Sequence, residues 1–318
     1  MDARLRRRTV TPEDLDAVVG LLVANDVALL GHGDHSREDV AADLGAERLR
    51  HEGWYVEGGA LVAYGWVGAV AGSTQVQLDL CVRRDADPGL GSGVLAHLES
   101  HAVALVTAAG HDHAVLEAYA YRADERARGW FAGRGFTAQM TYTRMRLDLG
   151  GADPGPPQPP PDVRLRRTDG SETDLRLVHR LEEDAFTGHY GHVPRDFETW
   201  RTSFDRHGPG WNRVYLASLD GEPVGQLAGT PQYEADDCGY VRSVGVIGRG
   251  RGRGVAKALL RQYFSDCRSA GRAGVLLHVD AANVTGALRL YESVGMRPVL
   301  EIDGWSKRLS APGPVDGW

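Results

Sequence analysis

The chain has 318 residues, enough for two ordinary domains, and its 42% hydrophobic and 25% charged residues are typical of a globular protein. A formal net charge of −7 argues against a general nucleic-acid binder, which presents a strongly basic domain. No apolar run is long enough to span a bilayer, and the basic N-terminus lacks the apolar stretch of a signal peptide. We therefore expect a cytoplasmic protein with no membrane or nucleic-acid partner. Three widely spaced cysteines fit a reducing compartment.

The chain opens with a strand and a helix whose pattern returns in the second half. Arg-Leu-Arg-Arg stands at both Arg4–Arg7 and Arg164–Arg167. In each place a hydroxyl residue follows, Thr11 or Ser171, and then acidic residues and apolar residues at helical spacing. A hydroxyl cap with acidic residues in the first turn is typical of a helix start. Both segments are predicted to fold as a short strand followed by an amphipathic helix.

A glycine-rich turn precedes the next predicted helix of the first half. It contains Gly91, but Pro88 removes one main-chain donor, and Asp85 and Asp87 add negative charge.

On the helix after this turn, His97 and His101 have the i, i+4 spacing of a metal-binding pair. No third ligand is evident in the sequence. We therefore expect exposed or core histidines, and no metal.

Residues 150–162 read GGADPGPPQPPPD, and prolines at this density favour an extended spacer. This linker separates a predicted N-terminal domain, 1–149, from a C-terminal domain, 163–310, with a tail at 311–318. The matched pairs Gly91/Gly254, Phe131/Tyr291 and Gly135/Gly295 are 163, 160 and 160 residues apart. A nearly constant offset indicates duplication. The predicted fold is α/β (α+β), two tandem domains that each have a mixed twisted sheet flanked by helices.

The most informative segment lies in the second half, where a β-rich run over 240–246 leads into a glycine- and arginine-rich turn over 247–254. Apolar residues at helical spacing between 255 and 267 predict that the turn opens a helix. The first amides of a helix lack partners, and glycines let a large anion come close, so this geometry binds a phosphate or diphosphate. Arg249, Arg251 and Arg253 add positive charge and forked donors.

Other interpretations of this turn are a solvated basic loop, a nucleoside-triphosphate loop and an arginine–glycine nucleic-acid segment. The second needs Gly-Lys-Ser/Thr, which is absent, and the third is longer and has no helix behind it. A dinucleotide-binding fingerprint falls at the first strand of its domain, whereas this turn comes late.

Downstream, Val275–Asp280 reads as a buried strand, and 283–296 reads as a short helix with an Asn cap and a glycine stop. Arg251-x-x-Gly254-x-Ala256, this strand and the helix with Leu-Tyr291-Glu together resemble the GNAT superfamily of acetyl-coenzyme A-dependent N-acetyltransferases. The strict match covers 240–296, and a looser pattern covers both halves.

The resemblance implies that the cofactor's pantetheine arm pairs with the strand before the turn, and that loop amides hold its diphosphate. It also implies that Tyr291 gives a proton to the departing sulphur. The residues that it assigns to the cofactor, acetyl-coenzyme A, are Val244, Gly245, Val246, Arg251, Gly252, Arg253, Gly254, Val255, Ala256 and Asn283.

The attacking amine is protonated at neutral pH, so a base must take a proton from it. Many GNAT enzymes carry a glutamate on the strand before the turn, where this chain has Tyr240. Glu234 is our candidate base, with a solvated acidic turn as the alternative. Residues expected at the acceptor are Tyr240, His278, Asp280 and His189.

The predicted activity is therefore transfer of acetyl to a primary amine of a small molecule by direct attack, by a monomer or homodimer. The tandem halves with a proline-rich linker are similar to mycothiol synthases, which acetylate the cysteinyl amine of a thiol glycoside with their C-terminal half. An aminoglycoside-like or other natural-product amine fits equally well. The first half, with Phe131 at the tyrosine position, is expected to shape the pocket. The alternatives are an acetyl-coenzyme A sensor without turnover, or a GNAT scaffold that uses another acyl donor or performs decarboxylation.

Overall fold

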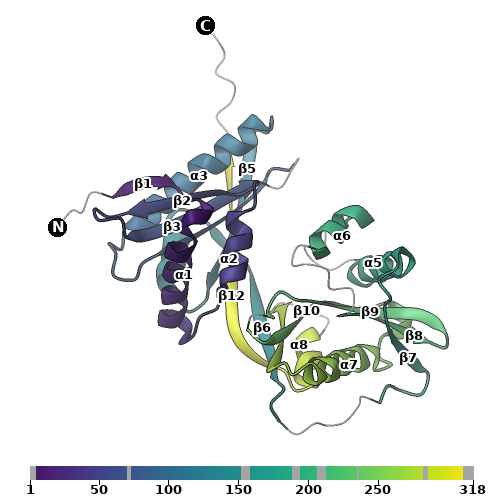
Figure 1. Ribbon diagram of the computed structural model, residues 1–318. Helices are drawn as coiled ribbons and strands as arrows, with labels where there is room; N and C mark the ends of the chain where they lie inside the picture. Colours follow the sequence, from purple (N-terminus) through teal and green to yellow (C-terminus); the bar gives the residue numbers. More distant parts are fainter. Residues whose placement is uncertain are drawn as a thin grey trace. The chain divides into compact units, whose positions relative to one another are not determined.

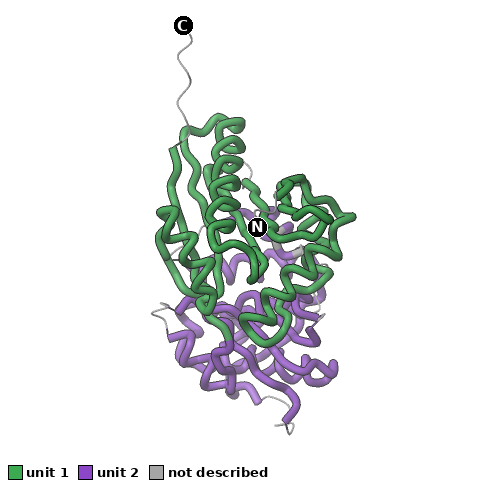
Figure 2. The backbone as a smooth tube through the Cα atoms, turned by 90° about the vertical axis from the view of Figure 1, so that its left-hand side faces the viewer, with its two compact units in different colours: residues 1–142, 300–318 green, residues 143–299 purple. Residues whose placement is uncertain are grey.

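The computed structural model describes residues 5–69, 73–151, 158–187, 194–205, 213–234, 236–281 and 286–310. It confirms the mixed α/β fold, because each of its two compact units contains a mixed sheet covered by helices. Unit 1 comprises residues 1–142 and 300–318, and unit 2 comprises 143–299 (Figure 2).

Unit 1 has the strand order β1-β2-β3-β4-β5-β12, in which β4 and β5 are parallel and the other pairs with a known register are antiparallel (Figure 1). The strands are β1 (Arg6–Thr9), β2 (Arg50–Tyr55), β3 (Leu61–Ala69), β4 (Gln75–Val82), β5 (His113–Tyr121) and β12 (Arg297–Ser310). The helices are η1 (Pro12–Asp14), α1 (Leu15–Leu30), α2 (Arg37–Leu44), α3 (Leu90–Ala108) and α4 (Glu125–Gly133).

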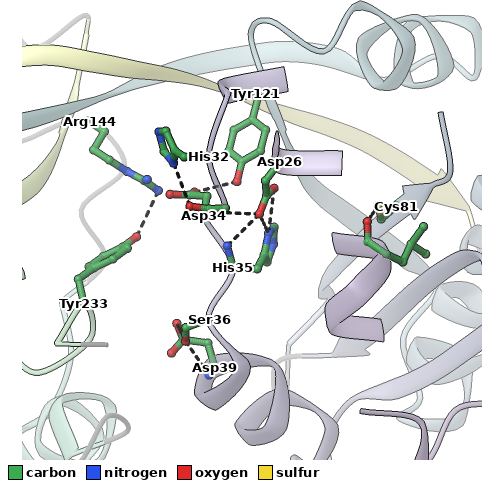
Figure 3. Close-up of polar contacts among 12 residues, drawn as sticks. Asp26, His32, Asp34, His35, Ser36, Asp39, Cys81, Tyr121, Arg144 and Tyr233 are labelled. Carbon is green, nitrogen blue, oxygen red and sulfur yellow. Dashed lines mark hydrogen bonds and ion pairs between the residues drawn. The ribbon is translucent and has the colours of Figure 1, made fainter. Parts of the chain in front are cut away.

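Alternating strand residues give unit 1 a core on each face of its sheet. On β3, Val67 belongs to the core that α3 covers with Leu98, whereas Tyr64 belongs to the core of α1 and α2. The turn after α1 is fixed by buried Asp26, which accepts hydrogen bonds from the backbone and the ring of His35 (Figure 3).

Unit 2 has the strand order β6-β11-β10-β9-β8-β7, to which β6 (Thr137–Asp148) contributes its residues from 143 on. Among the pairs with a known register, only β10 and β11 are parallel. The strands are β7 (Val163–Arg167), β8 (Val214–Leu219), β9 (Glu222–Thr230), β10 (Cys238–Val246) and β11 (Gly274–Asp280). The helices are α5 (Glu172–Phe186), α6 (Phe197–Asp205), η3 (Gly248–Gly250), α7 (Val255–Ser269) and α8 (Ala287–Glu292).

The helices of unit 2 form where the sequence pattern places them. Ser171 caps α5 by accepting a hydrogen bond from the backbone of Asp174. Leu175 and Val178 of α5 are buried with α6 on one face of the sheet. Leu259 of α7 and Tyr291 of α8 belong to the core of the other face. The glycine turn before α7 therefore lies at one end of a well-packed helix.

The compact units do not follow chain order. β12 pairs with β5 over nine residues, from Ile302↔Tyr121 to Ser310↔His113, so residues 300–310 belong to unit 1. The strand β6 (Thr137–Asp148) passes from unit 1 into unit 2 at residue 143. The domain bounds 1–149 and 163–310 were inferred from the sequence repeat, and this division into domains stays a prediction. Residues 152–157 of the predicted linker lie outside the described residues.

Candidate functional site

A fork opens between β10 and β11. The two strands pair over four residues, from Cys238↔Gly274 to Val241↔Leu277, and no further pair is seen in the described part although β10 runs to Val246. On its other side β10 stays paired with β9 as far as Val246. Main-chain groups of residues 244–246 that would face β11 thus lack a strand partner. Buried backbone groups of this kind need a partner, which an extended ligand can supply.

A cavity of about 680 Å³ adjoins the unpaired end of β10, a volume typical of a cofactor or small-molecule site. Nine of the predicted residues line it, namely Val244, Gly245, Val246, Arg251, Gly252, Gly254, Val255, Ala256 and Tyr291. Arg253 does not line it; its half-exposed side chain lies 3.7 Å from Asp162. Asn283 and His189 lie outside the described residues.

The glycine turn holds a conformation that suits an anion. Gly252 and Gly254 have φ of +73° and +77°, in the left-handed region, and no side chain caps α7. Successive main-chain N–H groups in such a turn form an anion-binding concavity at the positive end of the helix dipole. Lys257, in the first turn of α7, also lines the cavity. Sequence reasoning missed this residue, and its place in the first helical turn was the available signal.

The loop arginines are tied to the protein. Arg251 donates from Nε to the carbonyl of Val246 at 3.0 Å and from Nη2 to the carbonyl of Ala185 at 3.1 Å. Arg249 donates to the carbonyl of Pro223. These guanidinium groups therefore brace the turn, and Arg251 and Lys257 also line the cavity.

Tyr291 lies at the wall of the same cavity, on α8. Its side chain is largely buried, and its hydroxyl makes no hydrogen bond to any other residue that the structure describes. Burial, with a smaller contribution from Tyr240, raises the pKa of Tyr291 to about 12. The phenol is therefore fully protonated at neutral pH and holds a proton that it can donate.

The structure brings Tyr240 and His278 together where the two strands begin to separate, with Tyr240 Oη 3.0 Å from His278 Nδ1. Neither residue lines the cavity itself. Asp280 is the last residue of β11, on the same strand as His278.

Glu234 is not brought to the fork. It pairs with Arg213 and, at 2.5 Å, with Arg272, and it lines a separate cavity of about 170 Å³. None of the residues around that smaller cavity lines the larger one. Glu234 and Tyr291 therefore do not share a site in this structure, which sequence spacing alone did not reveal.

The matching turn of unit 1 is filled by the protein itself. The helix α3 already begins at Leu90, and Gly89 has φ of −76°, so the left-handed turn of unit 2 is missing. Asp87 Oδ1 accepts a hydrogen bond from the Gly89 amide at 2.7 Å, where a phosphate would bind. Trp130 donates from Nε1 to the carbonyl of Pro88, and its indole lies 2.3 Å from where a Cβ of Gly91 would stand. A carboxylate and an indole thus occupy this turn.

The two helical histidines of unit 1 have a third potential ligand that the sequence did not reveal. Glu52 of β2 lies with His97 and His101 in one cluster. Arg7 donates to His97 Nδ1 at 2.6 Å, which leaves the proton of the neutral ring on Nε2, 2.9 Å from His101 Nε2. Arg7 and Arg50 also pair with Glu52. Because metal-binding histidines donate from their second nitrogen instead of accepting there, we interpret the cluster as a hydrogen-bonded network.

The known proteins that resemble this chain are acetyltransferases. The acetyltransferase (GNAT) family matches residues 175–296. A mycothiol acetyltransferase from Cellulomonas flavigena is 30% identical over 266 residues, which cover 76% of this chain and 70% of that protein. Mycothiol acetyltransferases from Acidothermus cellulolyticus and Thermobispora bispora are 30% and 34% identical, over 58% and 52% of this chain. These two alignments span 62% and 56% of the relatives, less than two thirds of their length.

Solved structures extend the likeness to almost the whole chain. A GCN5-related N-acetyltransferase from Sphaerobacter thermophilus superposes with a TM-score of 0.82 at 26% identity, covering 97% of this chain and 96% of that one. A tandem GNAT protein from the clavulanic acid biosynthesis pathway superposes with a TM-score of 0.70 at 17% identity, covering 98% and 100%, and shares the fold.

Within the described residues, no helix is both long and apolar enough to span a bilayer.

Proposed function

Because this chain belongs to the GNAT family of acetyltransferases, we propose that it transfers the acetyl group of acetyl-coenzyme A to a primary amine of a small molecule. The observation that carries the proposal is the cavity at the fork, which has an anion-binding glycine turn and the buried phenol of Tyr291 in one lining. We assign catalysis to the second half of the chain, 163–310, in which both features lie.

The lining fits the cofactor in two ways. The unpaired main chain of residues 244–246 would hold the pantetheine arm as an added strand. The amides around Gly252 and Gly254, with Lys257, would hold the diphosphate, and Arg251 keeps the turn in place. Asn283 is expected to contact the pantetheine region. When bound, the cofactor supplies an activated acetyl thioester.

The chain itself supplies a proton. An amine that attacks the acetyl carbonyl carbon expels a thiolate, which is a better leaving group when it is protonated. Tyr291 Oη holds a proton at neutral pH and lies in the lining of the cavity. We propose that this hydroxyl protonates the departing sulphur as general acid.

The acceptor proposed first is mycothiol-type, the cysteinyl amine of a thiol glycoside. The names of the curated relatives support this choice. An aminoglycoside-like or other natural-product amine is the alternative acceptor.

The test is release of free thiol from acetyl-coenzyme A in the presence of single amines, among them cysteinyl glycosides, aminoglycosides and simple alkylamines. We expect amine-dependent thiol release with at least one of them. Cofactor binding without thiol release on any amine would support the sensor function instead. If acetyl-coenzyme A does not bind to the chain, the proposal is wrong.

We also expect one coenzyme A per chain. In unit 1 the carboxylate of Asp87 accepts a hydrogen bond from the amide of Gly89, and the indole of Trp130 packs against Gly91. In unit 2 the position that matches Trp130 is Leu290, which lines the open cavity. Isothermal titration calorimetry on the full chain should give a stoichiometry of about one. A stoichiometry of two would show that unit 1 opens to the cofactor.

A further inference from the structure

Tyr240 and His278 flank the point at which β10 and β11 separate. Tyr240 pairs with Leu276 next to the last pair of the two strands, and His278 follows that last pair. The ring centroids of Tyr240 and Tyr233 lie 5.1 Å apart, so the phenol of Tyr240 is held by an aromatic neighbour as well as by His278. Tyr240 lies on β10 four residues before Val244, a residue that lines the cavity.

Arg144 sets the direction of the hydrogen bonds in this group. The buried guanidinium donates from Nε to His278 Nε2 at 3.0 Å. It also donates from Nη2 to Tyr233 Oη at 3.3 Å (Figure 3). A guanidinium has donors and no acceptor, so His278 Nε2 must offer its lone pair. The neutral imidazole then carries its proton on Nδ1 and donates it to Tyr240 Oη.

This direction decides what Tyr240 can do. Its oxygen accepts from His278, and its own hydrogen is not used in that bond. Burial raises the pKa of Tyr240 to about 12, so a phenolate is not populated at neutral pH and cannot serve as a stored base. A phenol in this state can accept a proton only while it releases its own.

We propose that Tyr240 is the proton relay through which the acceptor amine is deprotonated, with His278 and Arg144 as positioning residues. The proposal rests on the proposed acetyl transfer. An N–H bond of the ammonium breaks as an O–H bond forms at Tyr240 Oη, and the original hydroxyl proton passes to a water molecule. The electron pair stays on nitrogen, where it attacks the acetyl carbon. Tyr240 is neutral before and after, and the proton ends in solvent.

The first test is Tyr240→Phe, which keeps the ring and removes the relay. For an alkylamine that is protonated at the assay pH, kcat/KM should fall about 100-fold, within the usual range for a proton-transfer residue. For an alkoxyamine, which is already neutral at that pH, the fall should be much smaller. Affinity for coenzyme A should not change. An equal loss for both amines, or no loss for either, would overturn the relay.

The positioning residues are tested by the pH profile. Arg144→Gln removes the donor that occupies His278 Nε2, so the pH profile of kcat/KM should change from that of the wild type. His278→Asn keeps an N–H donor near the place of Nδ1 and should retain more activity than His278→Leu. An unchanged pH profile together with equal activity of the two His278 variants would show that these residues only support the fold.

A spectroscopic readout separates failure of the relay from failure of the acetyl transfer. Nitrogen-15 NMR of the full chain should find His278 neutral and protonated on Nδ1 at neutral pH. The Nε2-protonated tautomer or the imidazolium would contradict the relay even if acetyl transfer is found. Absence of thiol release with every amine would instead overturn the acetyl transfer, and the relay with it, whatever the tautomer.

Discussion

Gly252→Asp is expected to weaken binding of acetyl-coenzyme A by about 100-fold. Gly252 has φ of +73°, lines the cavity and has open space at its Cβ position. Asp tolerates this backbone conformation better than most residues. Its carboxylate would stand beside the diphosphate, and two like charges about 5 Å apart repel by about 3 kcal/mol at an effective dielectric constant of about 20. Titration calorimetry with coenzyme A measures the change.

Gly271→Asp is the matched control. Gly271 has φ of +76°, also has open space at its Cβ position, and follows the C-terminal end of α7, away from the cavity lining. The two variants should lose similar thermal stability because they carry the same backbone strain. Only Gly252→Asp should lose affinity. Equal affinity in both variants would mean that the diphosphate does not bind at this turn.

Tyr291→Phe is expected to lower kcat by about 10²- to 10⁴-fold, the usual range for a general acid. Coenzyme A affinity should stay within about twofold, since the hydroxyl makes no hydrogen bond within the described residues and acts on the departing thiolate. The packing should survive, because Phe131 occupies the matching position of the first half and is 1% exposed. Steady-state kinetics with a saturating amine, together with calorimetric binding, measures both quantities.

Tyr119→Phe removes a tyrosine hydroxyl from an exposed position of unit 1 and serves as the control. It should leave kcat and affinity unchanged. If Tyr291→Phe turns over as fast as the wild type, the hydroxyl of Tyr291 takes no part in the reaction. A parallel loss of thermal stability and of turnover would indicate damage to the core around α8 instead of loss of a proton donor.

The elements that we propose hold the cofactor were predictable because they are local structures. The positive φ of Gly252 and Gly254, the helix that starts at Val255 and the buried face of α8 with Tyr291 all lie within 45 residues of one another. Glycine content and helical periodicity report such features directly. The nine cavity-lining residues that the family resemblance pointed to belong to these short segments and to the strand that leads into them.

The polar clusters were less predictable because they depend on contacts between distant segments. Arg144 reaches His278 from a strand that lies 134 residues earlier in the chain. Arg213 and Arg272 hold Glu234 in a separate cavity, and Glu52 joins two histidines of a helix that starts 38 residues later. Sequence spacing does not encode which side chains meet across a sheet.

By itself, the sequence determined the local elements of this protein: the repeat, the glycine turn, the helix that follows the turn, and the tyrosine that lies in the cavity wall. Only the tertiary structure decided that residues 300–310 complete the sheet of unit 1 by pairing with β5, and that Arg144 sets the direction of the hydrogen bond at Tyr240. The physical reason is how far apart along the chain the interacting residues lie. Backbone conformation and helix capping depend on neighbours along the chain, whereas strand pairing and the partner of a buried charge depend on which distant segments pack together.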